Sequence, residues 1–367
     1  MKKWLVLLLS LALLLPLAAS AQEVVNVYNW EDYIDEAVLD QFEEETGIHV
    51  NYMRFTTNED MMVSVRANPG AYDVIFPSEY CVERLIAEDL LAEINYDNVP
   101  NMSYTLESLL NPDYDPNNAH SVPYMWGTVG ILYNTTMVDE GDLSQGWGIL
   151  WDEKYANNIL MFNNSRDAFA IAGKMLGKSL NPQSTADVEE AAQKLKEQKG
   201  VVQSYVMDEV FDKMSGGEAA LAPYYTGDGM TMMQDNPDLA IFLPAEGTNR
   251  FVDGMCIPKG ARHKEAAEMF INFMCETQVA LANAEYICYS SPQTQVRSLL
   301  PPELAESDMM YPSADYLALC ETMLVLPTDV NDAMSKAWSD VRSYDSSGKD
   351  WVFPVMLAAM LALSAYG

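Results

Sequence analysis

Residues 24–55 read VVNVYNWEDYIDEAVLDQFEEETGIHVNYMRF, and their pattern indicates a strand, a helix and a second strand. The valines at the start favour a β-strand over residues 24–28. A helix is predicted from Asp35 to Thr46, because apolar residues recur on one face and Gly47 can end it. Alternating apolar residues from Ile48 onward then predict the next strand.

The predicted alternation of strands and helices continues as far as residue 87. A second helix is predicted from Asn58 to the Asn-Pro-Gly at 68–70, then a short strand over 72–76, then a helix that Ser78 begins. This order is typical of a largely parallel α/β sheet, in which ligands bind at the carboxyl ends of the strands. YNWEDY (28–33) and PSEY (77–80) follow the first and third strands, so we expect both to line one crevice.

The remainder of the chain predicts a second α/β unit. Residues 97–118 form a predicted loop, and SVPYMWGTVGILYN (121–134) is extended enough to cross into a second lobe. Beyond it we expect a helix over 185–199, a strand over 240–243 and one apolar helix over 264–286. Two α/β lobes joined by short crossings are therefore predicted.

The N-terminus has the pattern of a signal peptide over residues 1–21. Lys2 and Lys3 precede an apolar run over 4–17, and Ala-Ser-Ala at 19–21 offers a cleavage site before Gln22. The alternative is a transmembrane anchor, but the apolar run is short for that role. We therefore expect an exported protein, periplasmic or on the extracellular face of the cytoplasmic membrane.

Residues 344–367 read as a linker and an apolar tail, without a charged residue over 351–367. As a helix those residues would be about 26 Å long, which is short for a bilayer core. Three interpretations stay open: attachment to a membrane, a truncated or wrongly assigned chain end, or packing inside the protein.

The formal net charge of −33 excludes nucleic acid as an expected partner and raises the local concentration of small cations. Solubility of an exported protein explains such a charge equally well. The five cysteines contain no C-x-x-C, so buried free thiols are expected, although one disulfide is compatible with export. His49, His120 and His263 are scattered, so we expect no metal site, no cofactor and no catalytic residue.

Aromatic residues recur beside acids at predicted strand ends. Besides YNWEDY, the pattern occurs in PYYTGD (223–228), RFVDG (250–254) and EYICYSSP (285–292). Ordinary core packing is the alternative explanation for each aromatic residue.

The same stretches resemble the extracellular polyamine-binding proteins of ABC transporters, the spermidine/putrescine receptors. The resemblance runs from about residue 24 to 343 and is carried in order by YNWEDYI, FEEETGIHV, YDVIFPSEY, VPYMWGTVGILYN, LPAEG, FVDGMCIPKGA, INFM, YSSP and KAWSDV. It implies a two-lobed periplasmic-binding-protein fold (type II) with the ligand cleft between the lobes. Lobe 1 would comprise 22–127 and 252–297, and lobe 2 would comprise 128–251 and 298–343.

The resemblance also implies the ligand-binding residues. An aromatic box matches Trp30, Tyr33, Tyr80, Tyr225, Phe251 and Tyr289. Acidic contacts match Asp32, Asp167, Asp228 and Asp253, and Ser78 matches a polar contact. Asp253 with Asp228 is expected at one end of the ligand, and Asp32 with Asp167 at the other. Carboxylates replace the hydration of buried ammonium groups, and ring faces suit the methylene chain.

Two departures affect the expected ligand. Asn164 stands where spermidine-type relatives carry aspartate, and Met323 lies near a position of a polar glutamine, which favours putrescine over spermidine. The implied partners are a polyamine and the permease subunits of an ABC transporter, with the receptor as a monomer. Another small solute (sugar, amino acid or iron) is the nearest alternative, and an acid-pair hydrolase is a more distant one.

Overall fold

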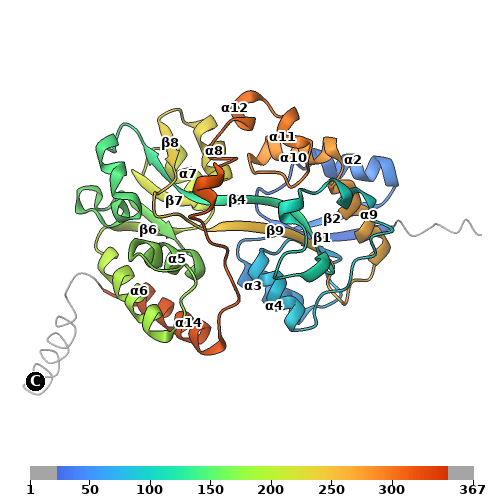
Figure 1. The fold of residues 1–367 in the computed structure, drawn as a ribbon, viewed down its shortest axis with the longest axis horizontal. Helices are drawn as coiled ribbons and strands as arrows, with labels where there is room; N and C mark the ends of the chain where they lie inside the picture. The colour runs from blue at the N-terminus through green and yellow to red at the C-terminus, as the bar shows by residue number, and fades with distance from the viewer. Residues whose placement is uncertain (1–22, 346–367) are drawn as a thin grey trace, which may run out of the picture.

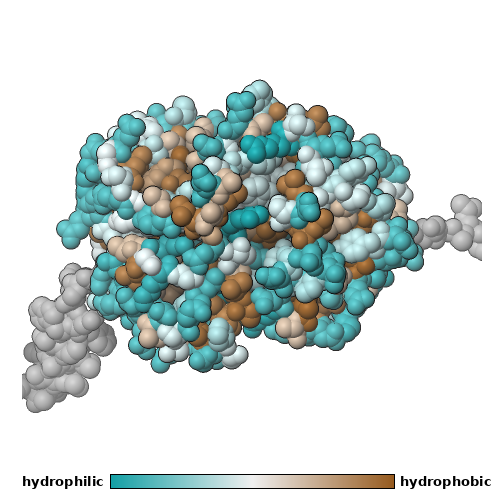
Figure 2. Space-filling view, viewed as in Figure 1, coloured by the Kyte–Doolittle hydropathy of each residue, from teal (hydrophilic) through white to brown (hydrophobic). Residues whose placement is uncertain are grey.

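The computed structural model describes residues 23–345, which form two α/β lobes connected by long strands (Figure 1). The predicted signal peptide and the apolar tail lie outside the described residues. Within residues 23–345, no helix is long and apolar enough to cross a membrane. Figure 2 shows hydrophilic residues over much of the visible face, with smaller hydrophobic areas between them.

The predicted alternation in the first lobe is confirmed. β1 (Val24–Trp30) pairs in parallel with β2 (His49–Phe55) and β3 (Val74–Ile75). The intervening helices are α2 (Ala37–Thr46), α3 (Asn58–Ala67) and α4 (Glu79–Ala87). Gly47 ends α2 in the left-handed conformation with φ 75°, as expected for a glycine at a helix end.

β3 is shorter than the strand predicted over 72–76. The Asp73 carboxylate accepts hydrogen bonds from the backbone N–H of Asn26 (2.9 Å) and from that of Arg262 (2.9 Å). The backbone N–H of Asp73 also donates to the Asn26 carbonyl at 2.7 Å, so this residue is joined to β1 through both its backbone and its side chain.

A nine-stranded sheet runs through both lobes in the order β2-β1-β3-β9-β4-β7-β5-β6, with β8 also paired to β4. The first part of β4 (Ser121–Asn134) pairs with β9 (Arg250–Cys256), and its last part pairs with β7 (Leu221–Tyr225) and β8 (Leu239–Phe242). Figure 1 shows β4 and β9 running between the two halves of the molecule. The predicted crossing at 121–134 is therefore confirmed.

The second lobe is built on β5 (Ile159–Phe162) and β6 (Val202–Val206), which pair in parallel. Its helices are α5 (Ser165–Met175), α6 (Thr185–Gln198), α7 (Glu209–Ser215), α8 (Thr226–Asp235) and α14 (Thr328–Ser343). Within residues 23–345, 3-10 helices occupy Pro100–Tyr104, Glu107–Leu109 and Pro116–Asn118 before β4, and Glu140–Trp151 and Glu153–Tyr155 after it.

The single helix predicted over 264–286 is wrong. The chain forms α9 (Lys264–Met274) and α10 (Thr277–Ile287), because the backbone at Glu276 is extended (φ −65°, ψ 139°). The short helices α11 (Val296–Leu299), α12 (Pro302–Ala305) and α13 (Ala314–Leu317) follow.

Two main hydrophobic cores support the lobes. One contains Phe42 and Phe270 with much of 25–126 and 251–289, and the other contains Trp147 and Phe162 with much of 129–239. Leu300, Leu304, Met310 and Tyr311 are also buried in the first core. All five cysteines are free thiols.

Candidate functional site

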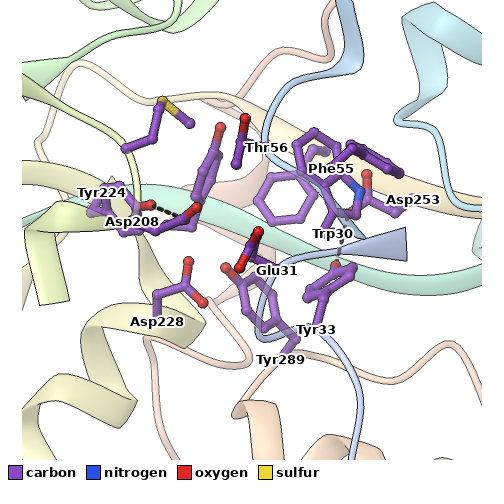
Figure 3. A pocket seen from close by; sticks show the side chains of 13 residues that line it. Trp30, Glu31, Tyr33, Phe55, Thr56, Asp208, Tyr224, Asp228, Asp253 and Tyr289 are labelled. Carbon is purple, nitrogen blue, oxygen red and sulfur yellow. Dashed lines mark hydrogen bonds between the residues drawn. The ribbon is translucent and has the colours of Figure 1, made fainter. Parts of the chain in front are cut away.

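A cavity of about 60 Å³ lies where strand ends of both lobes meet the crossing strand β9 (Figure 3). The first lobe contributes residues that end β1 and β2, and the second contributes residues that end β6 and β7. The lining residues are Trp30, Glu31, Tyr33, Phe55, Thr56, Met207, Asp208, Tyr224, Tyr225, Asp228, Phe251, Asp253 and Tyr289. The cavity lies at strand ends as the strand-end rule predicts, and YNWEDY (28–33) lines it, whereas no residue of PSEY (77–80) is among its lining residues.

Four aromatic rings from both lobes form a continuous wall. Tyr225 packs edge-on against Phe251 with ring centres 5.5 Å apart, and Phe251 packs against Tyr289 at 5.8 Å. Tyr289 in turn meets Tyr33 at 5.1 Å and almost at a right angle. Edge-to-face contacts of this kind hold each ring in place, so an apolar ligand chain would find a rigid surface.

Trp30 is fixed separately on the first lobe. Its indole N–H donates to the Phe76 carbonyl at 2.8 Å, and its ring packs against Phe55 at 4.6 Å. Because the polar edge of the indole is already bonded to the protein, the ring presents apolar surface to the cavity.

Asp253 is the acid of the crossing strand, and it is buried. Its Oδ2 accepts a hydrogen bond from the Tyr33 hydroxyl at 2.7 Å, and its Oδ1 accepts one from Ser78 Oγ at 2.6 Å. Burial raises the pKa of Asp253 to about 6, although both hydrogen bonds act in the opposite direction. A cation beside Asp253 would therefore favour its charged form.

Two further carboxylates, Asp208 and Asp228, come from the second lobe. Figure 3 shows them on one side of the cavity, with Asp253 on the other. Burial raises the pKa of Asp228 to about 8; Tyr289 lowers it through a hydrogen bond, and Asp208 and Asp32 raise it further. From the sequence, Asp228 and Asp253 are expected at one end of the ligand, whereas Figure 3 shows them on different sides of the cavity.

Seven of the eleven residues expected to bind ligand line this cavity: Trp30, Tyr33, Tyr225, Asp228, Phe251, Asp253 and Tyr289. Two others lie behind them. Ser78 contacts Asp253, and Asp167 accepts a hydrogen bond of 3.1 Å from the Tyr225 hydroxyl. Burial raises the pKa of Asp167 to about 7, with the Tyr225 hydrogen bond opposing this effect.

Asp32 and Tyr80 do not line the cavity. Asp32 is exposed and adopts a left-handed backbone (φ 41°), and its neighbour Glu31 lines the cavity instead. The Tyr80 hydroxyl donates to Glu59 at 3.2 Å, and the Arg166 guanidinium lies 4.8 Å from the Tyr80 ring centre. Tyr80 thus faces a different cavity, lined also by Arg84 and by residues of α14.

Six lining residues were not predicted: Glu31, Phe55, Thr56, Met207, Asp208 and Tyr224. Phe55 ends β2, and Asp208 follows β6 by two residues. The strand-end rule applied to these two strands would have indicated both.

The chemistry of the cavity suits an elongated cation. Its walls are mostly aromatic, its acids lie on opposite sides, and none of its lining residues is basic. Arg250, which lies next to Phe251 in sequence, packs over Trp126 at 5.2 Å and is not a lining residue. In the described residues 23–345, no group of three or more His, Cys, Asp or Glu residues could hold a metal ion.

Two α/β lobes that enclose a cavity at their strand ends define a solute-binding protein of the periplasmic-binding-protein class. The model of the bacterial extracellular solute-binding protein family matches residues 71–319, and the chain belongs to this family. A hypothetical lipoprotein family model (MG045 family) also matches residues 1–105. The protein is therefore an exported one, as predicted.

Individual relatives cover almost the whole chain. The spermidine/putrescine-binding periplasmic protein of Salmonella typhimurium is 33% identical over 91% of this chain and 96% of its own length. The spermidine/putrescine-binding periplasmic protein of Escherichia coli is 33% identical over 86% of this chain and 92% of its own length. A solved structure of a putative spermidine/putrescine ABC transporter from Listeria monocytogenes is 32% identical, with a TM-score of 0.83 over 88% of this chain and 100% of its own.

Proposed function

We propose that this protein captures a polyamine, putrescine or spermidine, between its lobes and delivers it to the permease of an ABC transporter. The observation that carries the proposal is the placement of Asp253 on one side of an aromatic cavity and Asp228 on the other, with no basic lining residue. The names of its relatives, which specify spermidine and putrescine, support the same ligand class.

The energetics favour a dication. An ammonium group taken out of water loses several kcal/mol of hydration, about the amount that a carboxylate and further acceptors can restore. Each ring face adds attraction of about 0.5–2 kcal/mol for a nearby cation. Closure of the lobes would exclude competing water and create the surface that a permease recognises.

The binding residues belong to the proposal as follows. Trp30, Tyr33, Tyr225, Phe251 and Tyr289 would contact the carbon chain, and Asp228 and Asp253 would bind its nitrogens. Ser78 and Asp167 would act by holding Asp253 and Tyr225 in position. We assign no catalytic step to these acids, and we propose that the receptor acts as a monomer without enzymatic activity.

Calorimetric titration of residues 22–345 tests the proposal. Putrescine and spermidine should bind with a stoichiometry of one and without product formation, whereas a sugar and a neutral amino acid should give no heat of binding. Tight binding of the sugar without polyamine binding would contradict the proposal. Turnover of any titrated compound would restore the enzyme alternative.

A further inference from the structure

Asp208 lies at a helix start but does not cap the helix. It directly precedes α7, where an aspartate side chain ordinarily accepts a hydrogen bond from a backbone N–H of the first turn. Here the Asp208 side chain makes no such bond. Its Oδ1 instead accepts from the Tyr224 hydroxyl at 3.3 Å, and the carboxylate lines the ligand cavity.

Asp208 faces the same space as Asp228. Both side chains appear together on the second-lobe side of the cavity in Figure 3. Each is also held near a tyrosine: Asp208 by Tyr224, and Asp228 by Tyr289. Neither tyrosine neutralises a carboxylate, because a protonated hydroxyl carries no charge, and burial raises the pKa of both hydroxyls well above its ordinary value.

The charged groups that shift these two acids are themselves acids. Burial raises the pKa of Asp208 to about 6, and Glu31 and Asp32 raise it further, while the Tyr224 hydrogen bond lowers it. Two half-buried carboxylates repel each other when both are ionised, and a cation between them would remove that cost. The cavity supplies the space for that cation, because both carboxylates line it.

We propose that Asp208 and Asp228 together bind one nitrogen of the ligand at the second-lobe side of the site, opposite Asp253. The first lobe contributes a further lining acid, Glu31. This proposal rests on the polyamine-binding function and extends it to a residue for which the relatives' motifs gave no expectation. The paired acids would select an unsubstituted primary ammonium group. Such a group carries three N–H donors, enough for both carboxylates and one further acceptor, whereas an acetylated nitrogen carries one donor and no charge.

The test is calorimetric titration of Asp208→Asn with putrescine, with Asp212→Asn as the matched control. Asp212 is an exposed acid on the same helix, so its replacement removes an equal charge without touching the cavity. Asp208→Asn should bind putrescine at least about tenfold more weakly than the unaltered protein, because one of the two counter-charges is lost. Asp212→Asn should change the affinity for putrescine less than about twofold, because solvent and salt screen the charge of the exposed Asp212 carboxylate.

The double variant Asp208→Asn/Asp228→Asn tests whether the two acids hold the same nitrogen. Its loss should depart from the product of the two single losses by about threefold or more, which is expected only for groups that share a partner. The ratio of putrescine to N-acetylputrescine affinity should also fall in Asp208→Asn, which a merely structural role would leave unchanged.

The outcomes separate the two proposals. Binding of putrescine by the unaltered protein with equal affinities for Asp208→Asn and Asp212→Asn would overturn the role of Asp208 alone. A double variant whose loss equals the product of the single losses would show that the acids act at separate nitrogens and would also overturn it. Failure of the unaltered protein to bind any polyamine would instead refute the function on which the proposal rests.

Discussion

Ser78 Oγ donates a hydrogen bond of 2.6 Å to Asp253 Oδ1, and this contact joins the start of α4 to the crossing strand β9. Ser78 occupies the position before α4, yet its side chain does not cap the helix. Asn58 donates a further hydrogen bond to Ser78 Oγ at 3.0 Å, which orients the hydroxyl toward Asp253. The acid therefore has a fixed orientation before any ligand arrives.

Replacement of Asp253 by asparagine should weaken putrescine binding by at least about tenfold, equivalent to about 1.4 kcal/mol. The amide keeps the shape of the side chain but removes the counter-charge of one desolvated ammonium group. Calorimetry measures the effect, with the exposed Asp97→Asn as the control for loss of charge. An unchanged affinity in Asp253→Asn would remove this residue from the binding site.

Ser78→Ala should weaken binding by about tenfold at neutral pH, because a hydrogen bond to a charged group is lost. The pKa of Asp253 should rise, since the Ser78 bond is the largest effect that lowers it. The loss of affinity should consequently grow as the pH is lowered from 8 to 6. The exposed Ser103→Ala is the control, and a pH-independent defect would argue against this role of Ser78.

The stability of the ligand-free protein should decrease as the pH rises from 5 to 9. Burial raises the folded-state pKa values of Glu79 and Asp228 to about 8 and that of Asp167 to about 7. A group whose pKa is raised by folding stabilises the fold below its unfolded pKa, and this contribution is lost as the pH passes the folded value.

Thermal unfolding measured across this range tests the expectation. With saturating putrescine, the melting temperature should fall less between pH 5 and 9, because a bound cation favours the ionised carboxylates. Asp228→Asn should also flatten the profile of the ligand-free protein. A melting temperature that rises steadily from pH 5 to 9 would contradict the assignment of these buried acids.

The sequence predicts the first lobe well because its signals are local. Apolar periodicity and Gly47 define α2, and the aromatic residues after β1 fall at the cavity because the carboxyl ends of parallel strands share an edge. The break between α9 and α10 has no such signal. The two residues between these helices are Cys275 and Glu276, and neither is a helix-breaking glycine or proline. Tertiary packing therefore decides where α9 ends.

The candidate site was only partly predictable for a similar reason. Asp32 and Glu31 are adjacent acids, and the left-handed backbone at Asp32 decides which of them lines the cavity. Nothing in the local sequence specifies that conformation. Tyr80 was expected at the ligand, but Arg166 from the second lobe covers its ring, a contact that depends on how the lobes meet.

Glu79→Gln should lower the free energy of unfolding by about 1–3 kcal/mol. The buried Glu79 carboxyl group, which its raised pKa keeps mainly protonated at neutral pH, accepts hydrogen bonds through its two oxygens from the backbone N–H of Val252 (3.0 Å) and that of Met323 (3.2 Å). Glutamine has only one acceptor oxygen, so one buried N–H would lose its partner. Urea unfolding measures the change.

Glu83→Gln provides the control on the same helix. Glu83 accepts from the backbone N–H of Val325 at 3.2 Å, but this bond is exposed, so water can replace it. The control should lose less than about 0.5 kcal/mol. Equal losses in the two variants would show that burial of Glu79 is not the source of its effect.

Gly227→Ala should disrupt the aromatic wall through a clash with Tyr289. A Cβ at Gly227 would lie 2.3 Å from Tyr289 Cδ2, so the buried ring would have to move from its position in the wall. We expect putrescine affinity to fall by about tenfold or more and the protein to lose about 1–3 kcal/mol of stability through overpacking. Gly200→Ala is the control, since a Cβ there meets nothing within 4 Å.

The double variant Gly227→Ala/Tyr289→Ala separates the clash from the loss of the ring. Removing the ring removes the clash, so the double variant should be more stable than the sum of the two single losses predicts. Its putrescine affinity should nevertheless stay low, because the wall between Phe251 and Tyr33 is then missing. Recovery of full affinity in the double variant would mean that Tyr289 contributes only packing, and that the ligand does not contact its ring.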